Sequence, residues 1–112
     1  MSWDQLYDNV KHGVEKAANK LEQTADLASL QIRLAGAEHK MQEAYLVLGR
    51  IAYQNAVKPS EKTQEELAKA VRVVALARKT VREMREQVQK QKEERDGLPA
   101  PQKETEPTQG QD

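Results

Sequence analysis

Two long runs of apolar residues at alternating spacings of three and four constrain this 112-residue chain more than any other feature. Such spacing keeps one apolar stripe on a single side of a slightly underwound helix, which is the pattern of coiled-coil packing. The runs therefore predict two long helices that pack against each other. Their members are Leu27, Leu30, Leu34, Ala37, Met41, Ala44, Leu48 and Ile51 in the first run, and Leu67, Ala70, Val74, Ala77, Val81, Met84 and Val88 in the second.

The segment between the runs, NAVKPSEKTQEE, predicts a tight connection. Pro59 cannot continue the first helix, and it pushes Lys58 out of the α region. Ser60 or Thr63 can cap the second helix, and Thr63 with Glu66 has the spacing of a capping box. A connection this short makes the helices antiparallel neighbours, in which positions whose numbers add to about 120 lie side by side.

The second helix is expected to end at the sequence Asp-Gly-Leu-Pro, residues 96–99. Gly97 stands where a left-handed C′ residue is favoured, and Pro99 follows shortly after it. The residues beyond Pro99 are rich in Pro, Gln, Thr and Glu and include no large apolar side chain. Such a segment cannot offset its ordering entropy by burial, so we expect residues 98–112 to be a disordered tail.

Residues 1–25 carry a third amphipathic pattern. This pattern is out of step with the run that begins at Leu27, and the change of phase falls at residues 23–26. Thr24 or Asp26 could cap a new helix there, although a single helix from Trp3 to Val57 is the alternative. The apolar members of the pattern are Trp3, Leu6, Tyr7, Val10, Val14, Ala17 and Leu21.

The stretch AYLVLGRIAY, residues 44–53, is apolar nearly all the way round and has one charge, at Arg50. In the expected hairpin it faces residues 70–77, which also carry one charge. A helix that is apolar on all sides must be covered on more than one side. Either the N-terminal helix folds back to make a three-helix bundle, or two hairpins pair as a dimeric four-helix bundle.

Apolar residues outside the two main stripes are the candidate interaction site. Gly49 stands four residues from each of two tyrosines, where it could let another backbone approach closely, or it could merely be tolerated. A glycine inside a helix costs roughly 1 kcal/mol relative to alanine. The candidate residues are Tyr45, Leu46, Gly49, Tyr53, Val73 and Leu76.

Composition argues against catalysis and nucleic-acid binding. Eighteen basic residues balance eighteen acidic ones, so the chain has no net field for nucleic acid or anionic lipid. The absence of cysteine excludes a disulfide framework, a thiol nucleophile and a thiolate zinc site. His12 and His39 have no partner at metal-ligand spacing, and no phosphate-binding or nucleophile motif occurs. We expect no enzyme activity, cofactor, metal or small-molecule substrate.

Several basic residues of the second helix have acidic residues three or four positions away, which indicates intrahelical ion pairs. Arg78 and Arg85 flank its apolar stripe and could instead meet acidic residues of a neighbouring helix.

The N-terminus offers an alternative role at a membrane surface. Trp and Tyr at one end of an amphipathic helix are typical of interfacial helices, and the inserting residues would be Trp3, Leu6, Tyr7 and Val10. The polar side mixes acidic and basic residues, which favours packing on the bundle instead. Asp4 and Asp8 do not suit a signal peptide, and no window approaches the roughly 18 to 20 apolar residues of a membrane span. We expect a cytoplasmic protein.

The segments SWDQLYDNVKHGVEKAANK and EAYLVLGRIAY, the latter at residues 43–53, resemble a group of small bacterial helical proteins of unassigned function. The resemblance covers about the first half of the chain. Many members of that group carry paired cysteines near the C-terminus that look like a zinc ribbon. This chain has no cysteine, so a zinc-dependent role does not carry over. The resemblance implies no catalytic residues.

These features together predict an all-α protein, an antiparallel coiled-coil-like hairpin with an additional N-terminal helix. The expected parts are the N-terminal helix at 1–25, the hairpin at 26–97 and the tail at 98–112. The expected function is a non-enzymatic interaction or scaffolding protein. Its expected partner is a second copy of itself, giving a dimer, or another helical protein.

Overall fold

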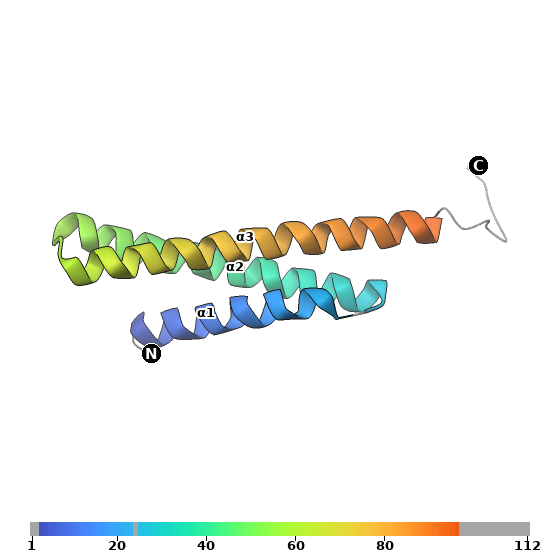
Figure 1. The fold of residues 1–112 in the computed structure, drawn as a ribbon, viewed down its shortest axis with the longest axis horizontal. Coiled ribbons are helices and arrows are strands. Elements are labelled where there is room, and N and C mark those ends of the chain that lie inside the picture. Colours follow the sequence, from blue (N-terminus) through green and yellow to red (C-terminus); the bar gives the residue numbers. More distant parts are fainter. Residues whose placement is uncertain (1–2, 24, 97–112) are drawn as a thin grey trace.

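The computed structural model describes residues 3–23 and 25–96 of the chain. Within them lie three α-helices, α1 (Trp3–Asn19), α2 (Leu27–Val57) and α3 (Glu61–Asp96), and one 3-10 helix, η1 (Lys20–Glu22). α2 and α3 form an antiparallel hairpin, and α1 folds back along it (Figure 1). The predicted all-α hairpin with an additional N-terminal helix is confirmed. Of the two arrangements considered for covering its apolar residues, the chain adopts the three-helix bundle.

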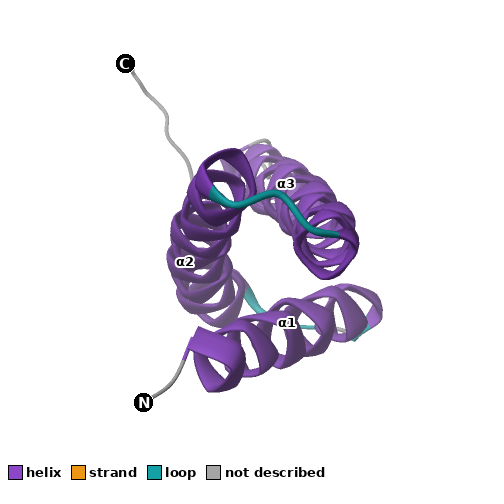
Figure 2. Ribbon diagram, turned by 90° about the vertical axis from the view of Figure 1, so that its left-hand side faces the viewer, coloured by secondary structure: helices purple, strands orange, loops and turns teal. Residues whose placement is uncertain are grey.

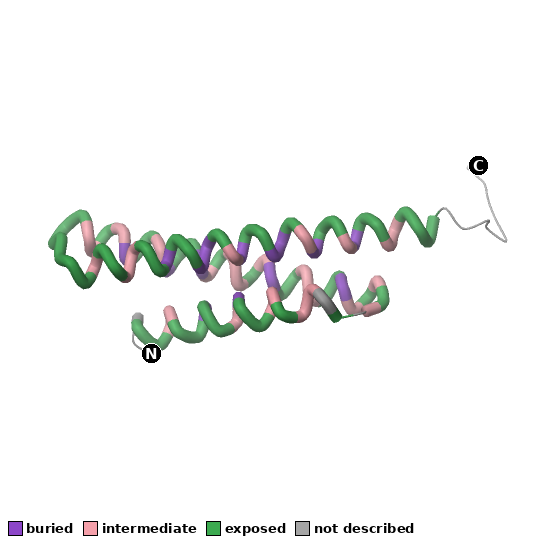
Figure 3. The backbone as a smooth tube through the Cα atoms, in the orientation of Figure 1, coloured by how far each residue is buried: buried purple, intermediate pink, exposed green. Residues whose placement is uncertain are grey.

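The core follows the two main apolar stripes, where α2 and α3 face each other (Figure 3). One cluster lies towards the hairpin turn and a smaller one lies near the middle of α3. Met41 packs against both clusters and so connects them. The larger cluster consists of Val10, Val14, Ala44, Val47, Ile51, Ala70, Val73, Val74 and Ala77, and the smaller of Ala37, Val81 and Met84.

The apolar side of α1 is part of this core. Val10 and Val14 are buried in the larger cluster, and Leu6 and Tyr7 pack against it. Farther along the chain, Ala17 of α1 and Leu21 of η1 pack against the smaller cluster, so the N-terminal pattern is used along most of its length. α1 therefore acts as the third wall of the bundle.

The break between α1 and α2 occurs where the apolar pattern changes phase. Asp26 is the N-cap of α2, and its side chain accepts a hydrogen bond from the Ser29 backbone N–H at 2.8 Å. This bond satisfies one of the donors that a helix start leaves free. The alternative of one continuous helix from Trp3 to Val57 is wrong.

Long polar side chains from α2 and α3 hold the carbonyl groups of this connection. Arg33 donates to the Lys20 carbonyl at 3.3 Å. Gln87 and Gln91 of α3 donate to the carbonyls of Leu21 and Ala25 at 3.0 and 2.9 Å. The Lys20 carbonyl also accepts from the Gln23 N–H at 3.1 Å. These side chains thus bond the carbonyl groups of the connection to α2 and α3, which fixes the point at which α1 turns back.

At the hairpin turn, Ser60 is the one of the two candidate residues that caps α3. The Ser60 hydroxyl accepts from the Thr63 N–H at 3.0 Å, and the Thr63 hydroxyl accepts from the Ser60 N–H at 3.0 Å. This is the reciprocal geometry of a capping box with Thr63 as its second member. The Thr63 hydroxyl also donates to Asn55 at 2.9 Å, across the turn. At the other end α3 extends to Asp96; the predicted C′ residue Gly97 and the predicted disordered tail at 98–112 lie outside the described residues.

Candidate interaction surface

The side of α2 that faces away from the other two helices carries a second stripe at alternating spacings of four and three. Viewed along the bundle, α1 and α3 lie to one side of α2 and leave its opposite side open (Figure 2). Every residue of this stripe is exposed, and none is Asp, Glu, Lys or Arg. We call it the outer stripe; it consists of Ala28, Ile32, Ala35, His39, Gln42, Leu46, Gly49 and Tyr53.

Three large apolar side chains project from the outer stripe. Ile32, Leu46 and Tyr53 are 74%, 69% and 68% exposed. Val57, one turn beyond Tyr53, is also exposed, and with Tyr53 and Pro59 it lines a shallow groove of about 390 Å³ at the hairpin turn. Exposed apolar side chains therefore recur from near the start of α2 to its end, with the polar residues His39 and Gln42 between them.

Four of the six predicted interaction residues lie on or beside this surface. Leu46, Gly49 and Tyr53 are members of the outer stripe, and Tyr45, 42% exposed, lies at its edge towards α3. A Cβ atom added at Gly49 meets nothing within 4 Å. No contact within the chain therefore requires a glycine at this position.

The assignment of Val73 and Leu76 to the interaction surface is wrong. Val73 is buried in the larger core cluster, and Leu76 packs against the same cluster. The extra apolar width of α3 at this level is covered by α1, whose Val10 and Val14 belong to that cluster. The N-terminal helix thus satisfies α3 but leaves the outward side of α2 uncovered.

Ile32 and Val57 are exposed apolar residues outside the six that the sequence predicts for the interaction site. Ile32 lies outside the stretch at 44–53, and its neighbours along the outer stripe are small or polar. The available signal is the repeated spacing of four and three from Ala28 to Tyr53 without a charged residue. That spacing marks a second coiled-coil-like stripe on a helix that already has one.

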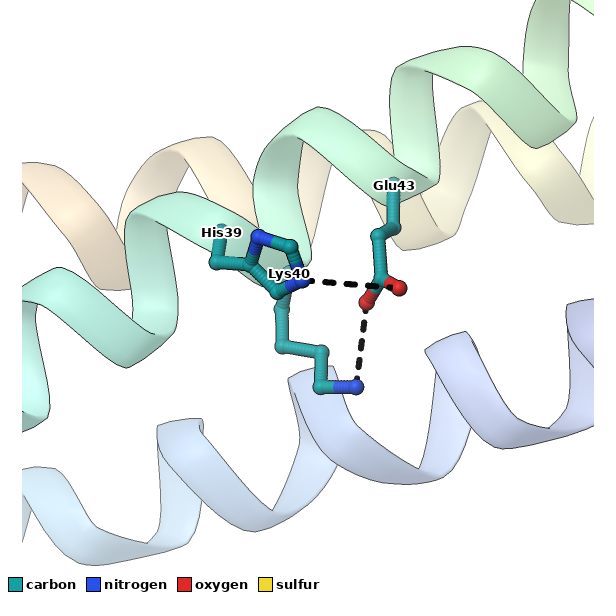
Figure 4. Close-up of polar contacts among 3 residues, drawn as sticks. All are labelled: His39, Lys40 and Glu43. Carbon is teal, nitrogen blue, oxygen red and sulfur yellow. Dashed lines mark ion pairs between the residues drawn. The ribbon is translucent and has the colours of Figure 1, made fainter.

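Charged residues on both flanks of the outer stripe have partners within the chain. Glu43 lies 3.0 Å from Lys40 Nζ and 3.6 Å from His39 Nε2 (Figure 4). On the other flank, Glu38 forms an ion pair with Arg85 of α3 at 2.7 Å. The expectation that Arg85 meets an acidic residue of the neighbouring helix is confirmed. The outer stripe itself has no Asp, Glu, Lys or Arg, and these pairs balance the charges of Glu43 and Glu38 on its flanks.

Lys40 also shows how closely α1 approaches α2. A Cβ atom at Gly13 of α1 would lie 2.8 Å from Lys40 Cε and 2.9 Å from its Cδ. Gly13 therefore makes room for the aliphatic part of Lys40, which passes over α1 to reach Glu43. This contact is on the inner side of α2, away from the outer stripe.

A second concave region lies among the first turns of α1, the last turns of α2 and the first turns of α3, with a volume of about 280 Å³. Burial is the largest cause that raises the pKa of the Tyr7 phenol above 10.0, so this hydroxyl is neutral at physiological pH. Acidic and basic residues balance on the lining, which gives the cleft no preference for an anion or a cation. Its charged residues are Asp4, Asp8, Glu66, Arg50, Lys62 and Lys69.

Within residues 3–23 and 25–96, no three His, Cys, Asp or Glu side chains come together as a possible metal group. None of the described helices combines the length and hydropathy needed to cross a membrane. The chain matches no protein-family model, no curated protein and no solved structure. The resemblance to small bacterial helical proteins therefore stays a prediction, and the surface of α2 is the feature that bears on function.

Proposed function

We propose that this chain is a non-enzymatic helical interaction protein that binds another helix through the outer stripe of α2. The partner helix belongs to a second copy of the chain or to another helical protein. The observation that carries the proposal is the exposure of Ile32, Leu46 and Tyr53 on one continuous, uncharged side of α2.

Helix-to-helix recognition suits this surface because the anchors recur at heptad spacing. Leu46 and Tyr53 are seven residues apart, and Ile32 is two heptads before Leu46, so all three reach the same side of a partner helix. Burying one such side chain contributes about 1.5–3 kcal/mol. Association itself costs about 4–15 kcal/mol, so several anchors must be buried together for binding to be measurable.

The packing of α1 weighs against the alternative of docking on a membrane through the N-terminal helix. Leu6, Tyr7 and Val10 contact the bundle, and they could insert into lipid only if α1 left the core. That opening would also expose Val14, which is buried beside Val10. The outer stripe needs no such rearrangement, and for this reason we place the interaction on α2.

The proposal in its self-associating form is tested by the solution mass of full-length variants. Leu46→Glu and Tyr53→Glu each place a charge on the outer stripe, where a partner helix would have to desolvate it. Val71→Glu is the matched control, because Val71 is an exposed apolar residue of α3 away from the stripe. Light scattering over a range of concentrations should give a lower mass for the two α2 variants than for the wild type and Val71→Glu. Equal masses for all four chains, with unchanged helical content, would overturn association through this stripe.

A further inference from the structure

We propose that the partner is a second copy of this chain, with the two α2 helices antiparallel about a two-fold axis that passes between His39 and Gln42. This inference rests on the proposed function and deepens it by naming the partner and the register. The order of large, small and polar residues along the outer stripe supports this register. Each layer is formed by one residue from each chain, and symmetry repeats it on the other side of the axis.

Large apolar side chains face small ones in every layer of this register except the two central layers. In an antiparallel coiled coil, the two heptad positions of a stripe alternate as partners across the interface. The large members of the outer stripe occupy one of these positions and the small members occupy the other. The resulting layers pair Ile32 with Gly49 of the second copy, Leu46 with Ala35 of the second copy, and Tyr53 with Ala28 of the second copy.

The central layers pair polar with polar. His39 faces Gln42 of the second copy, and Gln42 faces His39, on either side of the two-fold axis. Both side chains offer donors and acceptors, so each can satisfy the other when water is excluded. A polar layer inside an apolar stripe favours the one register in which it is paired, at some cost in stability.

Charges on the flanks select the same register. Glu43 lies beside Gly36 of the second copy, and Glu38 lies beside Tyr45 of the second copy, so no like charges meet. A shift of one heptad in one direction brings Glu43 beside its own copy, and a shift in the other direction brings Glu38 beside its own copy. Like charges at such contacts disfavour the shifted pairs.

A parallel pair fits less well on both grounds. It stacks each residue on its own copy, so Gly49 meets Gly49 and Ala35 meets Ala35, which leaves gaps between the wide Leu46 and Tyr53 layers. It also brings Glu38 beside Glu43 across the interface, because flanking positions five residues apart meet in parallel pairs. The antiparallel register avoids the gaps and the repulsion together.

Gly49 acquires a role in this arrangement. Within one chain nothing lies within 4 Å of a Cβ atom added there, so the glycine carries its helix penalty without an internal contact to explain it. In the antiparallel pair, Ile32 of the second copy lies directly over it. The missing Cβ lets the two backbones approach and gives the Ile32 side chain its space.

Cross-linking of mixed single-cysteine chains tests both the partner and the register. The natural sequence has no cysteine, so each introduced thiol is unique. Full-length Ala35→Cys and Leu46→Cys chains, one with a mass tag, are mixed, allowed to exchange and treated with a short bifunctional thiol reagent. The antiparallel register predicts that mixed dimers dominate. A parallel pair holds these two positions about 16 Å apart and yields same-chain-type dimers instead.

The outcomes separate this inference from the proposed function. Predominantly mixed Ala35→Cys and Leu46→Cys dimers support the register, particularly if Ala28→Cys mixed with Leu46→Cys, which is one heptad out of step, links less. Predominantly same-type dimers, or preferential linking of the out-of-step pair, overturn the register. If Leu46→Glu still lowers the mass in that case, association through the stripe survives. No cross-linked dimer from any mixture overturns the second-copy proposal outright.

A glycine pair supplies the second test. Gly49→Ala adds a methyl group beneath Ile32 of the second copy, whereas Gly36→Ala adds the same group on the flank. Both positions are free of contacts within the chain, so both variants should fold. Overpacking at Gly49 should raise the dimer dissociation constant by about tenfold, and Gly36→Ala should leave it within about twofold. Equal dissociation constants for the two variants would overturn the layer that joins Ile32 to Gly49.

Discussion

The outward sides of α2 and α3 are equally open to solvent and differ in chemistry. Along α3, the exposed side opposite the core is charged at most positions, and its charged residues are Glu61, Glu65, Arg72, Lys79, Arg82, Glu86, Glu93 and Asp96. Along α2, the outer stripe has no Asp, Glu, Lys or Arg over residues 28–53. Both helices belong to the same hairpin, and the inward sides of both form the same core.

The contrast separates what folding requires from what it does not. A helix whose outward side contacts only solvent ordinarily has charged residues on that side, and α3 follows this pattern. The fold of one chain supplies no reason for α2 to present Ile32, Leu46 and Tyr53 instead. The difference supports the proposal that the outward side of α2, rather than that of α3, binds a further surface.

The largest expected effect on stability comes from truncating a core residue, and the matched comparison is truncation of a residue of the outer stripe. Met84 is buried in the smaller core cluster, and Met84→Ala should lower the free energy of unfolding by about 2–5 kcal/mol. Leu46→Ala should change it by no more than about 0.5 kcal/mol at concentrations where the chain is a monomer. Urea denaturation followed by circular dichroism measures both values. A loss for Leu46→Ala close to that for Met84→Ala would mean that the outer stripe does serve the fold of a single chain.

Local signals were sufficient to predict the hairpin. The two apolar runs mark the facing sides of α2 and α3, and Pro59 with Ser60 and Thr63 marks the turn. The position of α1 could not be chosen from the pattern alone. An apolar side indicates that a helix needs cover, but which surface covers it depends on the length of the connection and on side chains distant in sequence. Gln87 and Gln91, which hold that connection, are such side chains.

The candidate surface was partly predictable for the same reason. Leu46 and Tyr53 point away from the first apolar run, and their exposure follows from helical period alone. Val73 and Leu76 were assigned wrongly because their cover comes from α1, and the angle at which α1 crosses the hairpin is a property of the packed bundle. Ile32 was missed because one apolar residue among small and polar neighbours gives a weak signal until the whole stripe is considered.

Three glycines give the next effect in size and sharpen the contrast between inner and outer sides. Gly36→Ala and Gly49→Ala should each raise the free energy of unfolding of the monomer by roughly 1 kcal/mol, because neither added Cβ meets an atom. Gly13→Ala should raise the free energy of unfolding by less, because Lys40 must move from a position 2.8 Å from the new Cβ. Thermal unfolding of dilute protein ranks the three variants by stability. A gain at Gly13 as large as at Gly49 would mean that the contact with Lys40 is not maintained.

Two glutamines of α3, two residues apart, compare its inner and outer sides directly. Gln91 donates to the Ala25 carbonyl in the connection between α1 and α2, and Gln91→Ala should cost about 1 kcal/mol. Gln89 is exposed and bonds only locally to Glu93 at 3.3 Å, so Gln89→Ala should cost no more than about 0.5 kcal/mol. Hydrogen exchange at residues 20–27 should rise in the first variant and not in the second. Equal exchange in both would show that Gln91 does not hold the connection.

The smallest effect concerns the start of α2, where the outer stripe also begins. The hydrogen bond from the Ser29 N–H is the largest cause that holds the pKa of Asp26 below its usual value of 3.8. A carboxyl whose pKa is depressed by folding contributes stability above the unfolded value, and the contribution is lost as pH falls through the folded value. Exchange of the first-turn amides of α2 should therefore rise below pH 3.8 in the wild type. Asp26→Asn keeps an oxygen acceptor that does not titrate, so exchange of the first-turn amides should not show this rise in the variant.

Because Ala28 lies in this turn and pairs with Tyr53 of the second copy in the proposed dimer, the same acid step should loosen the outermost layers before the central ones. Acid-induced exchange that is identical in wild type and Asp26→Asn would assign the loss to other carboxylates and leave the cap without a role in the stripe.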